Sequence, residues 1–444
     1  MGCIRLCRFI SIFTELHRRH ASSCTPDGPI HRRRADVLDC AHLLQLHDEH
    51  AYTKKDRADR AGACAPEKVT MRVLFVLENY IPHIGGAEMV FKNLAEQLVK
   101  QGHHVDLITH RLPETRRFEV INGVNVYRVR CFDSRYLFTF FSLPKVIQLA
   151  RKADVIHTTT FNGAPPAWCA AKIWRKPCVL TVHEVWINRW HEITDQTERS
   201  ASLHNFLEKM IYRLEFSHYA AVSKATQDQL HSIGIKGSTS VVYNGVEYDH
   251  FNPELYDPLA VRKKLFLEDT FVYFTYGRAG PSKGIEYIVK AVPKILKSIP
   301  RSKCVLMLSK DTAYKERYNR IKQMIHDMKI SKYVIILEPV PWKQLPSYIL
   351  AADCIVIPSL AEGFCFAAAE SAALGKSVVA TTAGSLPEVV SGRHVLVQPQ
   401  SENALADGVV KIYEDEADMT PLKRFSIEDN VRNYLNIYES IKKP

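Results

Sequence analysis

The chain has 444 residues, of which 46% are hydrophobic and 24% charged, a composition that excludes a disordered or fibrous protein. Its longest apolar runs are strand-length, so we expect no transmembrane helix, which needs roughly 18 consecutive apolar residues. The formal charge of +11 suggests anionic partners such as nucleotides, acidic lipids or nucleic acid. Because no CxxC pair with zinc spacing occurs, we expect reduced, buried thiols in a cytoplasmic protein.

Residues 1–70 are interpreted as a non-structural N-terminal extension. Their apolar periodicity is poor, and the apolar segment Ile10–Phe13 is too short for a signal peptide. A targeting segment is the second interpretation, although the acidic residues of this region argue against a transit peptide. We expect the first strand to begin at Met71, in the sequence MRVLFVLE.

From Met71 onward, strand-like and helix-like segments alternate in two series, separated by a proline-containing break at 248–258. Buried apolar strands that alternate with helices predict parallel sheets covered on both faces. The sequence therefore predicts an α/β protein with two doubly wound domains, 71–248 and 249–426, and a C-terminal helix within 427–444 that packs on a domain surface. The expected strands are Val73–Leu77, Val105–Thr109, Asp154–His157, Val179–His183, Tyr219–Val222, Ser240–Val242, Phe271–Tyr276, Lys303–Leu308, Val334–Leu337, Cys354–Ile357 and Ser377–Ala380. Neither domain is basic enough to demand nucleic acid as a partner.

Ligands of open α/β sheets bind beyond the C-terminal ends of the strands, so candidate site residues should follow strands. Gly85 and Gly86 lie between the first strand and the first helix, where their backbone and the helix N-terminus can approach an anion. The pattern is not GxGxxG, which makes a dinucleotide site a weak interpretation, and a tight turn is the alternative. His183 ends a later strand and is interpreted as functional, whereas His157 could be functional or could support the loop beneath His183.

The segment Gly277–Gly284, GRAGPSKG, follows a strand and precedes a helix. Its two cations, Arg278 and Lys283, can reach one phosphate, and Gly284 opens the helix. A solvated basic turn is the alternative interpretation. The segment is not a Walker loop, because GxxxxGK[ST] is absent.

Two acidic residues in the segment EGFCFAAAE, Glu362 and Glu370, carry the most specific signal. On one continuous helix they would be separated by about 80° and about 12 Å and would not converge. Pro358 and Gly363 instead place Glu362 on a loop and Glu370 one turn inside a helix that begins near Phe366. The two carboxylates could then contact opposite ends of one ligand, with the helix N-terminus directed at a phosphate between them.

With these residues in place, the chain from Met71 onward resembles the family-4 (group 1) retaining, nucleotide-sugar-dependent glycosyltransferases. The resemblance covers both predicted domains and rests on motifs in family order: GGAE at 85–88, His183, GRAGPSKG, Asn244-Gly245-Val246, the Glu362/Glu370 pair and SLPEVV at 385–390. It implies a glycosyltransferase-B architecture, in which two Rossmann-like domains face each other across a cleft and the last helix crosses back to the first domain.

The resemblance also implies roles for individual residues. Arg278 and Lys283 would bind the donor diphosphate and stabilise the charge on the leaving nucleotide. Glu362 and His183 would contact the transferred sugar, and Glu370 would bind the ribose hydroxyls. The remaining substrate-binding positions, several of which act through their backbone, would be Gly85, Gly86, Gly284, Gly363, Phe364 and Cys365.

The implied reaction is transfer of a hexose-type sugar from a UDP- or GDP-sugar to an acceptor hydroxyl, with retention of configuration and with no metal or other cofactor. A glycan or a lipid-linked molecule is the expected acceptor. The aromatic segment Tyr136–Phe141 could contact a membrane peripherally from the cytoplasm, or could be buried, and Trp186, Arg189 and Trp190 could line an acceptor site or could merely pack.

Three departures from the family pattern weaken the assignment of donor contacts. Ser282 stands where a basic residue is common, Cys365 stands where glycine is common, and AGSLPE at 383–388 has one glycine where a second is common. The alternative functions are a nucleotide-sugar 2-epimerase of the same architecture, an inactive nucleotide-sugar-binding subunit and an NAD oxidoreductase, the last of which lacks its glycine fingerprint.

Overall fold

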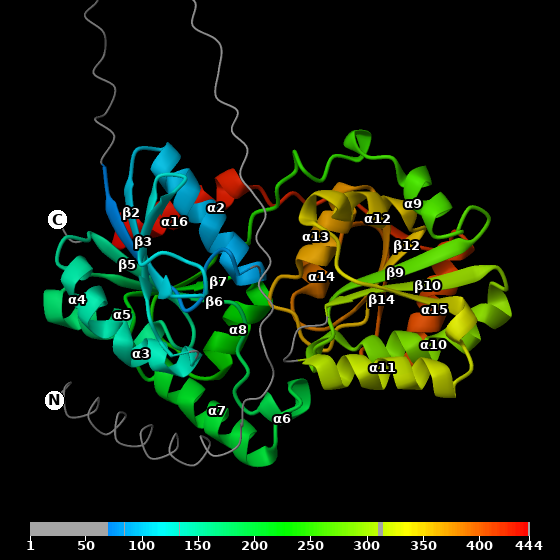
Figure 1. Cartoon of the computed structure of the whole chain (residues 1–444), viewed down its shortest axis with the longest axis horizontal. Helices are drawn as coiled ribbons and strands as arrows, with labels where there is room; N and C mark the ends of the chain where they lie inside the picture. Colours follow the sequence, from blue (N-terminus) through cyan, green and yellow to red (C-terminus); the bar gives the residue numbers. More distant parts are fainter. Residues whose placement is uncertain (1–69, 84, 133, 310–313, 443–444) are drawn as a thin grey trace, which may run out of the picture. The chain divides into compact units, whose positions relative to one another are not determined.

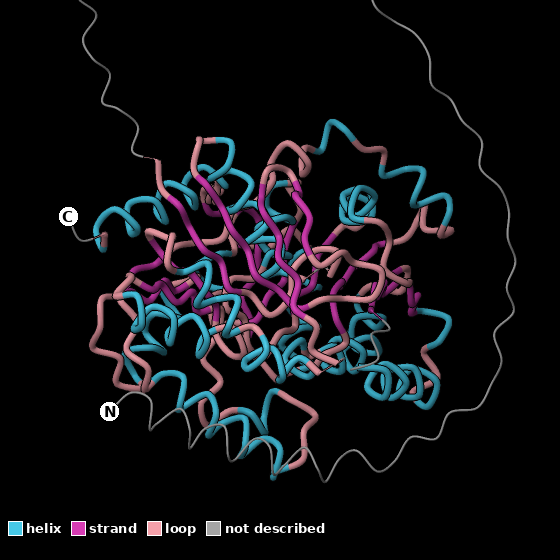
Figure 2. Tube along the Cα trace, turned by 60° about the vertical axis from the view of Figure 1, so that its left-hand side comes forward, coloured by secondary structure: helices cyan, strands magenta, loops and turns pink. Residues whose placement is uncertain are grey.

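The computed structural model describes residues 70–83, 85–132, 134–309 and 314–442. The extension predicted over residues 1–70 therefore lies outside the described residues, except for Thr70. The two series of strands form two separate sheets, and helices lie on both faces of each sheet (Figures 1 and 2).

The first sheet has eight strands in the order β3-β4-β2-β1-β5-β6-β7-β8. The pairing is parallel except between β3 and β4, which are antiparallel. The strands are β1 (Arg72–Val76), β2 (His104–His110), β3 (Phe118–Ile121), β4 (Val124–Val129), β5 (Val155–Thr159), β6 (Cys178–Val182), β7 (His218–Ala221) and β8 (Thr239–Val241). The helices of this series are α2 (Gly86–Lys100), α3 (Phe138–Phe141), α4 (Leu143–Ala150), α5 (Ala164–Trp174), α6 (Trp190–Ile193), α7 (Glu198–Tyr212) and α8 (Lys224–Ser232).

The second sheet has seven strands in the order β11-β10-β9-β12-β13-β14-β15, of which only β15 is antiparallel to its neighbour. The strands are β9 (Phe271–Arg278), β10 (Ser302–Ser309), β11 (Val334–Leu337), β12 (Cys354–Ile357), β13 (Ser377–Thr381), β14 (Gly392–Val397) and β15 (Asp418–Thr420). The helices are α9 (Pro258–Lys264), α10 (Ile285–Ser298), α11 (Lys315–Asp327), α12 (Leu345–Ala351), α13 (Phe366–Ala373), α14 (Leu386–Val389) and α15 (Glu402–Tyr413). The predicted class of two doubly wound α/β sheets is confirmed.

The last helix, α16 (Ile427–Ile441), packs beside α2 against the first sheet (Figure 1). Tyr434 and Tyr438, one turn apart, are fully buried there. The Nδ1 atom of His157 lies 2.6 Å from the Tyr438 hydroxyl, and its Nε2 atom lies 2.7 Å from Oγ1 of Thr181. Burial lowers the pKa of His157 to about 3, so this histidine is a neutral structural residue that ties α16 to β5 and β6.

The β3–β4 hairpin is an element that the strand–helix alternation did not predict. It turns at Asn122-Gly123, where both residues have positive φ angles of 47° and 84°. Asn-Gly is the dipeptide that two-residue hairpins favour, so the signal was present in the sequence. The hairpin leaves Phe118 and Val120 exposed on an edge strand.

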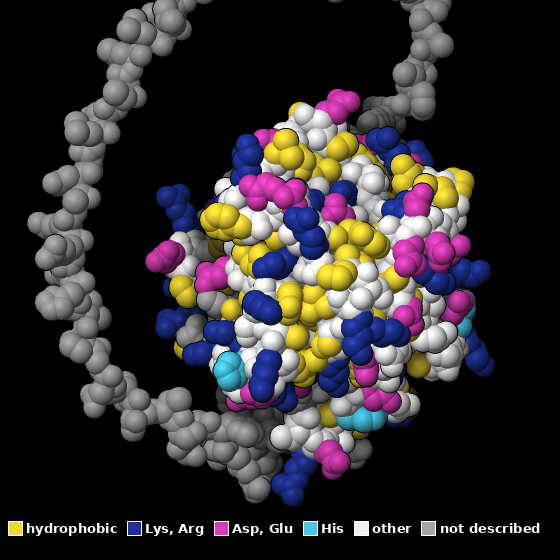
Figure 3. Space-filling model, turned by 90° about the vertical axis from the view of Figure 1, so that its right-hand side faces the viewer, with side chains coloured by type: hydrophobic (Ala, Val, Ile, Leu, Met, Phe, Trp, Pro, Cys, Tyr) yellow, Lys and Arg dark blue, Asp and Glu magenta, His cyan; other side chains and the backbone are white. Residues whose placement is uncertain are grey.

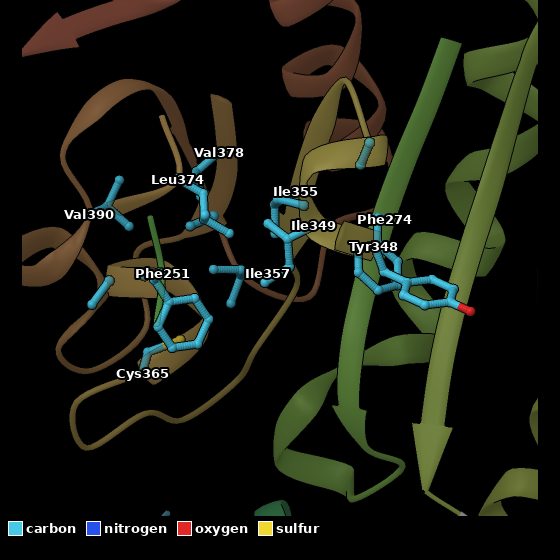
Figure 4. Close-up of a cluster of buried hydrophobic side chains, with 14 of the residues drawn as sticks. Phe251, Phe274, Tyr348, Ile349, Ile355, Ile357, Cys365, Leu374, Val378 and Val390 are labelled. Atoms are coloured by element: carbon cyan, nitrogen blue, oxygen red, sulfur yellow. The ribbon is translucent and has the colours of Figure 1, made fainter. Parts of the chain in front are cut away.

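The apolar interior of the second sheet reaches the C-terminal ends of its strands. Figure 4 shows Cys365 beside Phe251 in the same buried cluster as Ile355 and Ile357. The loop that carries Glu362 is therefore anchored at its far end in the core.

On the face shown in Figure 3, basic side chains are interspersed with acidic and apolar ones.

Candidate functional site

Two neighbouring strands of the second sheet, β9 and β12, carry the loops on which the candidate site is built. We call residues 277–284 the Lys283 loop and residues 358–365 the Glu362 loop. The carbonyl oxygen of Ser282 accepts a hydrogen bond of 2.6 Å from the backbone N–H of Leu360. Gly284 has a φ of 61°, and a Cβ atom there would collide with the carbonyl oxygen of Pro358. Glycine at position 284 therefore allows the two loops to touch.

This contact brings Lys283 and Glu362 together. The Nζ atom of Lys283 lies 2.7 Å from Oε1 of Glu362, and the Ser359 hydroxyl donates a 2.7 Å hydrogen bond to the same oxygen. Burial disfavours the ammonium, but the charge and hydrogen bond of Glu362 outweigh it and raise the pKa of Lys283. The site therefore holds a permanent cation beside an 8% exposed glutamate.

The backbone of Glu362 is fixed from a third strand end, after β13. Its carbonyl oxygen accepts a 3.1 Å hydrogen bond from the backbone N–H of Ser385. Gly384, with a φ of 55°, packs directly on that carbonyl, and a Cβ atom would collide with it. The segment that departs from the family pattern therefore supports Glu362 with its single remaining glycine.

Helix α13 begins at Phe366 and carries Glu370 one turn inside, as predicted. The Tyr276 hydroxyl donates a 2.8 Å hydrogen bond to Oε2 of Glu370, and burial raises the pKa of Glu370 to about 7. Cys365 precedes the helix with a φ of 67°, a conformation that glycine adopts without strain. This role of Tyr276 could not be predicted from the sequence, because an aromatic residue inside an apolar strand gives no sign that its hydroxyl faces a carboxylate.

The end of β6 supplies His183 from the first sheet. Burial lowers the pKa of His183 to about 4, so the imidazole is neutral at physiological pH. Its Nε2 atom is buried and has no hydrogen-bond partner among the described residues. Such a nitrogen can serve a ligand as donor or acceptor, depending on the tautomer.

The loops of the two sheets meet at Gly363. A Cβ atom at this position would collide with the carbonyl oxygen of His183, so the Glu362 loop packs directly on the backbone beside the histidine. The guanidinium of Arg189 also donates a 3.3 Å hydrogen bond to the carbonyl oxygen of Leu360. The structure therefore brings the backbone of His183 against the loop that carries Glu362, although the sequence places the two segments in different domains.

Helix α2 directs its N-terminus into the same region. Gly85 is its N-cap, and a Cβ atom on Gly86 would lie 3.6 Å from the ring of Phe366, the first residue of α13. The N-termini of α2 and α13 therefore lie close together, and both offer free N–H groups to an anion. Burial raises the pKa of the nearby Glu88, but hydrogen bonds from His83 and from the backbone, with further electrostatic contributions, together outweigh burial and leave the pKa below its usual value.

Two further residues were singled out from the sequence: Arg278 as a ligand of the diphosphate, and Trp190 as a candidate to line an acceptor site. Arg278 ends β9, is exposed and lies within electrostatic range of Glu184, as does Lys283. Trp190 is only 6% exposed and lies on α6, packed edge-on against Trp186, so it supports the loop instead of lining an open site.

Glu388 is a further residue that joins the two sheets. Its two carboxylate oxygens accept 2.9 Å hydrogen bonds from the backbone N–H groups of Lys224 and Ala225, at the N-terminus of α8. The hydroxyl of Tyr243 donates a third, also of 2.9 Å. The sequence marked Glu388 as part of a motif but contained no sign of this role, which depends on the approach of α8.

The arrangement suits a ligand with an anionic part and a hydroxyl-rich part. Lys283, Arg278 and two helix N-termini favour an anion, whereas Glu362, Glu370 and His183 offer hydrogen-bonding groups for hydroxyls.

In the part of the chain that the structure describes, no three histidine, cysteine or acidic side chains are grouped to hold a metal ion. No helix within the described ranges is long and apolar enough to cross a membrane.

Comparison with known proteins agrees with this geometry. Residues 84–250 match the family model Glycosyltransferase Family 4, and residues 259–431 match Glycosyl transferases group 1. An uncharacterized glycosyltransferase of Methanocaldococcus jannaschii is 28% identical over 83% of this chain and 98% of its own length. A D-inositol 3-phosphate glycosyltransferase of Corynebacterium jeikeium is 26% identical over 75% of this chain and 84% of its own.

The fold is shared with solved structures. HepE from Anabaena, in complex with UDP and glucose, superimposes with a TM-score of 0.67 at 19% identity, over 83% of this chain and 100% of its own. The two family matches lie in succession and together span most of the chain. The chain belongs to the group 1 glycosyltransferases and has the glycosyltransferase-B fold.

Proposed function

We propose that the protein transfers a hexose-type sugar from a nucleoside diphosphate sugar to an acceptor hydroxyl, with retention of anomeric configuration. The observation that carries the proposal is the pairing of Lys283 with Glu362, on a loop that packs against the backbone of His183 and next to the N-termini of α2 and α13. The donor we expect is a UDP-sugar, since HepE binds UDP, with a GDP-sugar as the alternative.

In the proposed reaction, the diphosphate lies against Lys283, Arg278 and the two helix N-termini. The bond between the anomeric carbon and the β-phosphate oxygen breaks as the acceptor oxygen forms its bond to the same face of that carbon. The proton of the acceptor hydroxyl passes to the departing phosphate oxygen, so charge and atoms balance. Lys283 stabilises the charge that develops on the leaving diphosphate, which is the largest expected contribution of the protein.

Glu370 would accept hydrogen bonds from the ribose hydroxyls, and Glu362 with the backbone of Gly363, Phe364 and Cys365 would hold the transferred sugar. His183 would contact that sugar from the first sheet. The positions of the residues support these roles: Glu362 lies on the loop before α13, with Lys283 beside it, and Glu370 lies one turn inside the helix.

A glycan or lipid-linked acceptor remains our proposal for the second substrate. In the part of the chain that forms the first sheet, Phe132 and Phe141 are 61% and 46% exposed. Their rings pack edge-on, with 5.6 Å between the ring centres. The guanidinium of Arg130 lies 5.1 Å from the Phe132 ring centre. Exposed aromatic side chains with a cation support peripheral contact with an anionic membrane surface. The six described cysteines are free, which supports a reducing, cytoplasmic location.

The test is a screen of UDP-, GDP- and ADP-sugars with the full chain, in which release of the free nucleotide is followed with and without added acceptors. The proposal expects cleavage of at least one donor, increased by an acceptor, with the α-configured donor giving an α-linked product. Conversion of UDP-N-acetylglucosamine to its epimer without acceptor would instead show a 2-epimerase. Nucleotide binding with no turnover of any donor would show an inactive binding subunit.

A further inference from the structure

The residue after His183 is a carboxylate that the proposed reaction leaves without a role. Glu184 follows β6 and lies where the two sheets meet, because a Cβ atom on Gly363 would lie 2.9 Å from its Cγ atom. Its side chain is half-buried. Glu184 is thus an acidic group that the first sheet presents to the loop carrying Glu362.

The Glu184 carboxylate interacts electrostatically with Glu362, Lys283 and Arg278, the charged residues of the candidate site. Burial raises the pKa of Glu184 and the negative charge of Glu362 raises it further, whereas Lys283, Trp186 and Arg278 lower it. Both cations proposed to bind the diphosphate therefore act on this one carboxylate. The net pKa of Glu184 remains above the usual value for glutamate, first because of burial and second because of the charge of Glu362.

The position of this carboxylate is fixed by a second buried acid. The indole Nε1 of Trp186 donates a 2.7 Å hydrogen bond to Oε2 of Glu184. The backbone N–H of Trp186 donates to Oε1 of Glu208 at 2.9 Å, and the indole of Trp190 donates to Oε2 of Glu208 at 2.7 Å. Glu208 is only 1% exposed, so the hydrogen bonds that hold Trp186 and Trp190 are made by a carboxylate that is itself fixed in the interior.

The second oxygen of Glu184 is available to a ligand. Within the described ranges, the hydrogen bond from Trp186 uses Oε2, and Oε1 makes none. An ionised carboxylate accepts hydrogen bonds and donates none, and it repels a phosphate. Because Lys283 and Arg278 serve the diphosphate, the group that suits Glu184 is a hydroxyl.

We propose that Glu184 binds the attacking hydroxyl of the acceptor through Oε1, and that Glu208 positions it by holding Trp186 and Trp190. The proposal rests on the proposed transferase function and deepens it, because it names the group in the first sheet that orients the acceptor. A hydroxyl held by Glu184 would face the sugar that Glu362 holds from the other side. As the sugar–phosphate bond breaks, the O–H turns from Oε1 of Glu184 to the departing phosphate oxygen, which takes the proton, and Glu184 stays unchanged.

A Glu184→Gln variant separates this role from a structural one, because the amide oxygen can still accept the hydrogen bond from Trp186. The assays are UDP affinity by calorimetry and cleavage of UDP-glucose, or of the donor found in the screen, with water as the probe acceptor. We expect the turnover number to fall by roughly tenfold or more, and UDP to bind equally well or more tightly because a negative charge near Lys283 is removed. Glu198→Gln, the same change at an exposed position on α7, should match the wild type.

Turnover of Glu184→Gln within about twofold of the wild type would overturn the proposal. Weaker UDP binding by the variant would also overturn it, since it would place Glu184 in the nucleotide site. The outcomes separate the two claims. If the wild type cleaves no donor, the proposed function fails and this inference fails with it, whereas an active wild type with an equally active variant removes this inference alone.

Discussion

Lys283 and Glu362 are 79 residues apart in sequence, and in the structure their charged atoms lie 2.7 Å from each other. The cation comes from the loop after β9 and the carboxylate from the loop after β12, two neighbouring strands of one parallel sheet. An incoming diphosphate therefore meets a lysine that is already positioned and charged. The pair also holds the Glu362 side chain beside the place proposed for the transferred sugar.

Glu370 should make nucleotide binding depend on pH. Its raised pKa of about 7 means that it is mostly protonated at pH 6 and mostly ionised at pH 8, and the ionised form is the better acceptor for ribose hydroxyls. UDP affinity should therefore rise between pH 6 and pH 8 in the wild type. Glu370→Gln should bind roughly tenfold more weakly at pH 8, with a smaller change between the two pH values. Calorimetry checks this, and identical pH profiles would argue against ribose binding by Glu370.

Glu208 should make stability depend on pH in a predictable direction. Burial raises its pKa to about 7, above that of the unfolded chain, so the folded state binds more protons between pH 4.5 and pH 7. The wild-type free energy of unfolding should fall as pH rises through this window. Relative to the wild type, Glu208→Gln should gain about 2–3 kcal/mol between pH 5 and pH 8. Urea denaturation at both pH values measures this, and a constant difference between the proteins would contradict it.

Gly363 should be intolerant of any side chain. A methyl group there collides with the carbonyl oxygen of His183, so Gly363→Ala should push the two loops apart. We expect donor turnover to fall by roughly 10²-fold, because displacements of about 1 Å at a reacting centre have effects of this size. Gly237→Ala is the control, since its added Cβ would meet only the Tyr219 ring, at 3.1 Å. Equal activity of the two variants would mean that this loop contact does not matter for turnover.

Phe132 and Phe141 should determine membrane contact. Sedimentation with phosphatidylserine vesicles should show that the double change Phe132→Ser and Phe141→Ser weakens binding roughly tenfold or more, since each exposed phenyl ring would lose its burial in lipid. Phe266→Ser, at an 86% exposed phenylalanine in the second series, is a matched control and should bind like the wild type. If both variants bind equally, the membrane contact lies elsewhere or is absent.

The alternation of apolar strands and helices was sufficient to predict two doubly wound sheets, because strands buried on both faces need uninterrupted apolar runs. The same reasoning placed Lys283, Glu362 and Glu370 near strand ends on one edge. It could not find Tyr276 or Glu208, which act through hydroxyl and carboxylate groups on buried elements. It also could not pair Gly363 with His183, because that contact depends on how two loops from different sheets meet.

The most direct measurement is turnover of the identified nucleotide sugar by Lys283→Ala at saturating donor. If Lys283 stabilises the leaving diphosphate, the turnover number should fall by roughly 10²–10³-fold. Lys297→Ala, at an exposed lysine near the end of α10, should retain wild-type turnover. Near-full turnover by Lys283→Ala under the same conditions would contradict the assignment of this site.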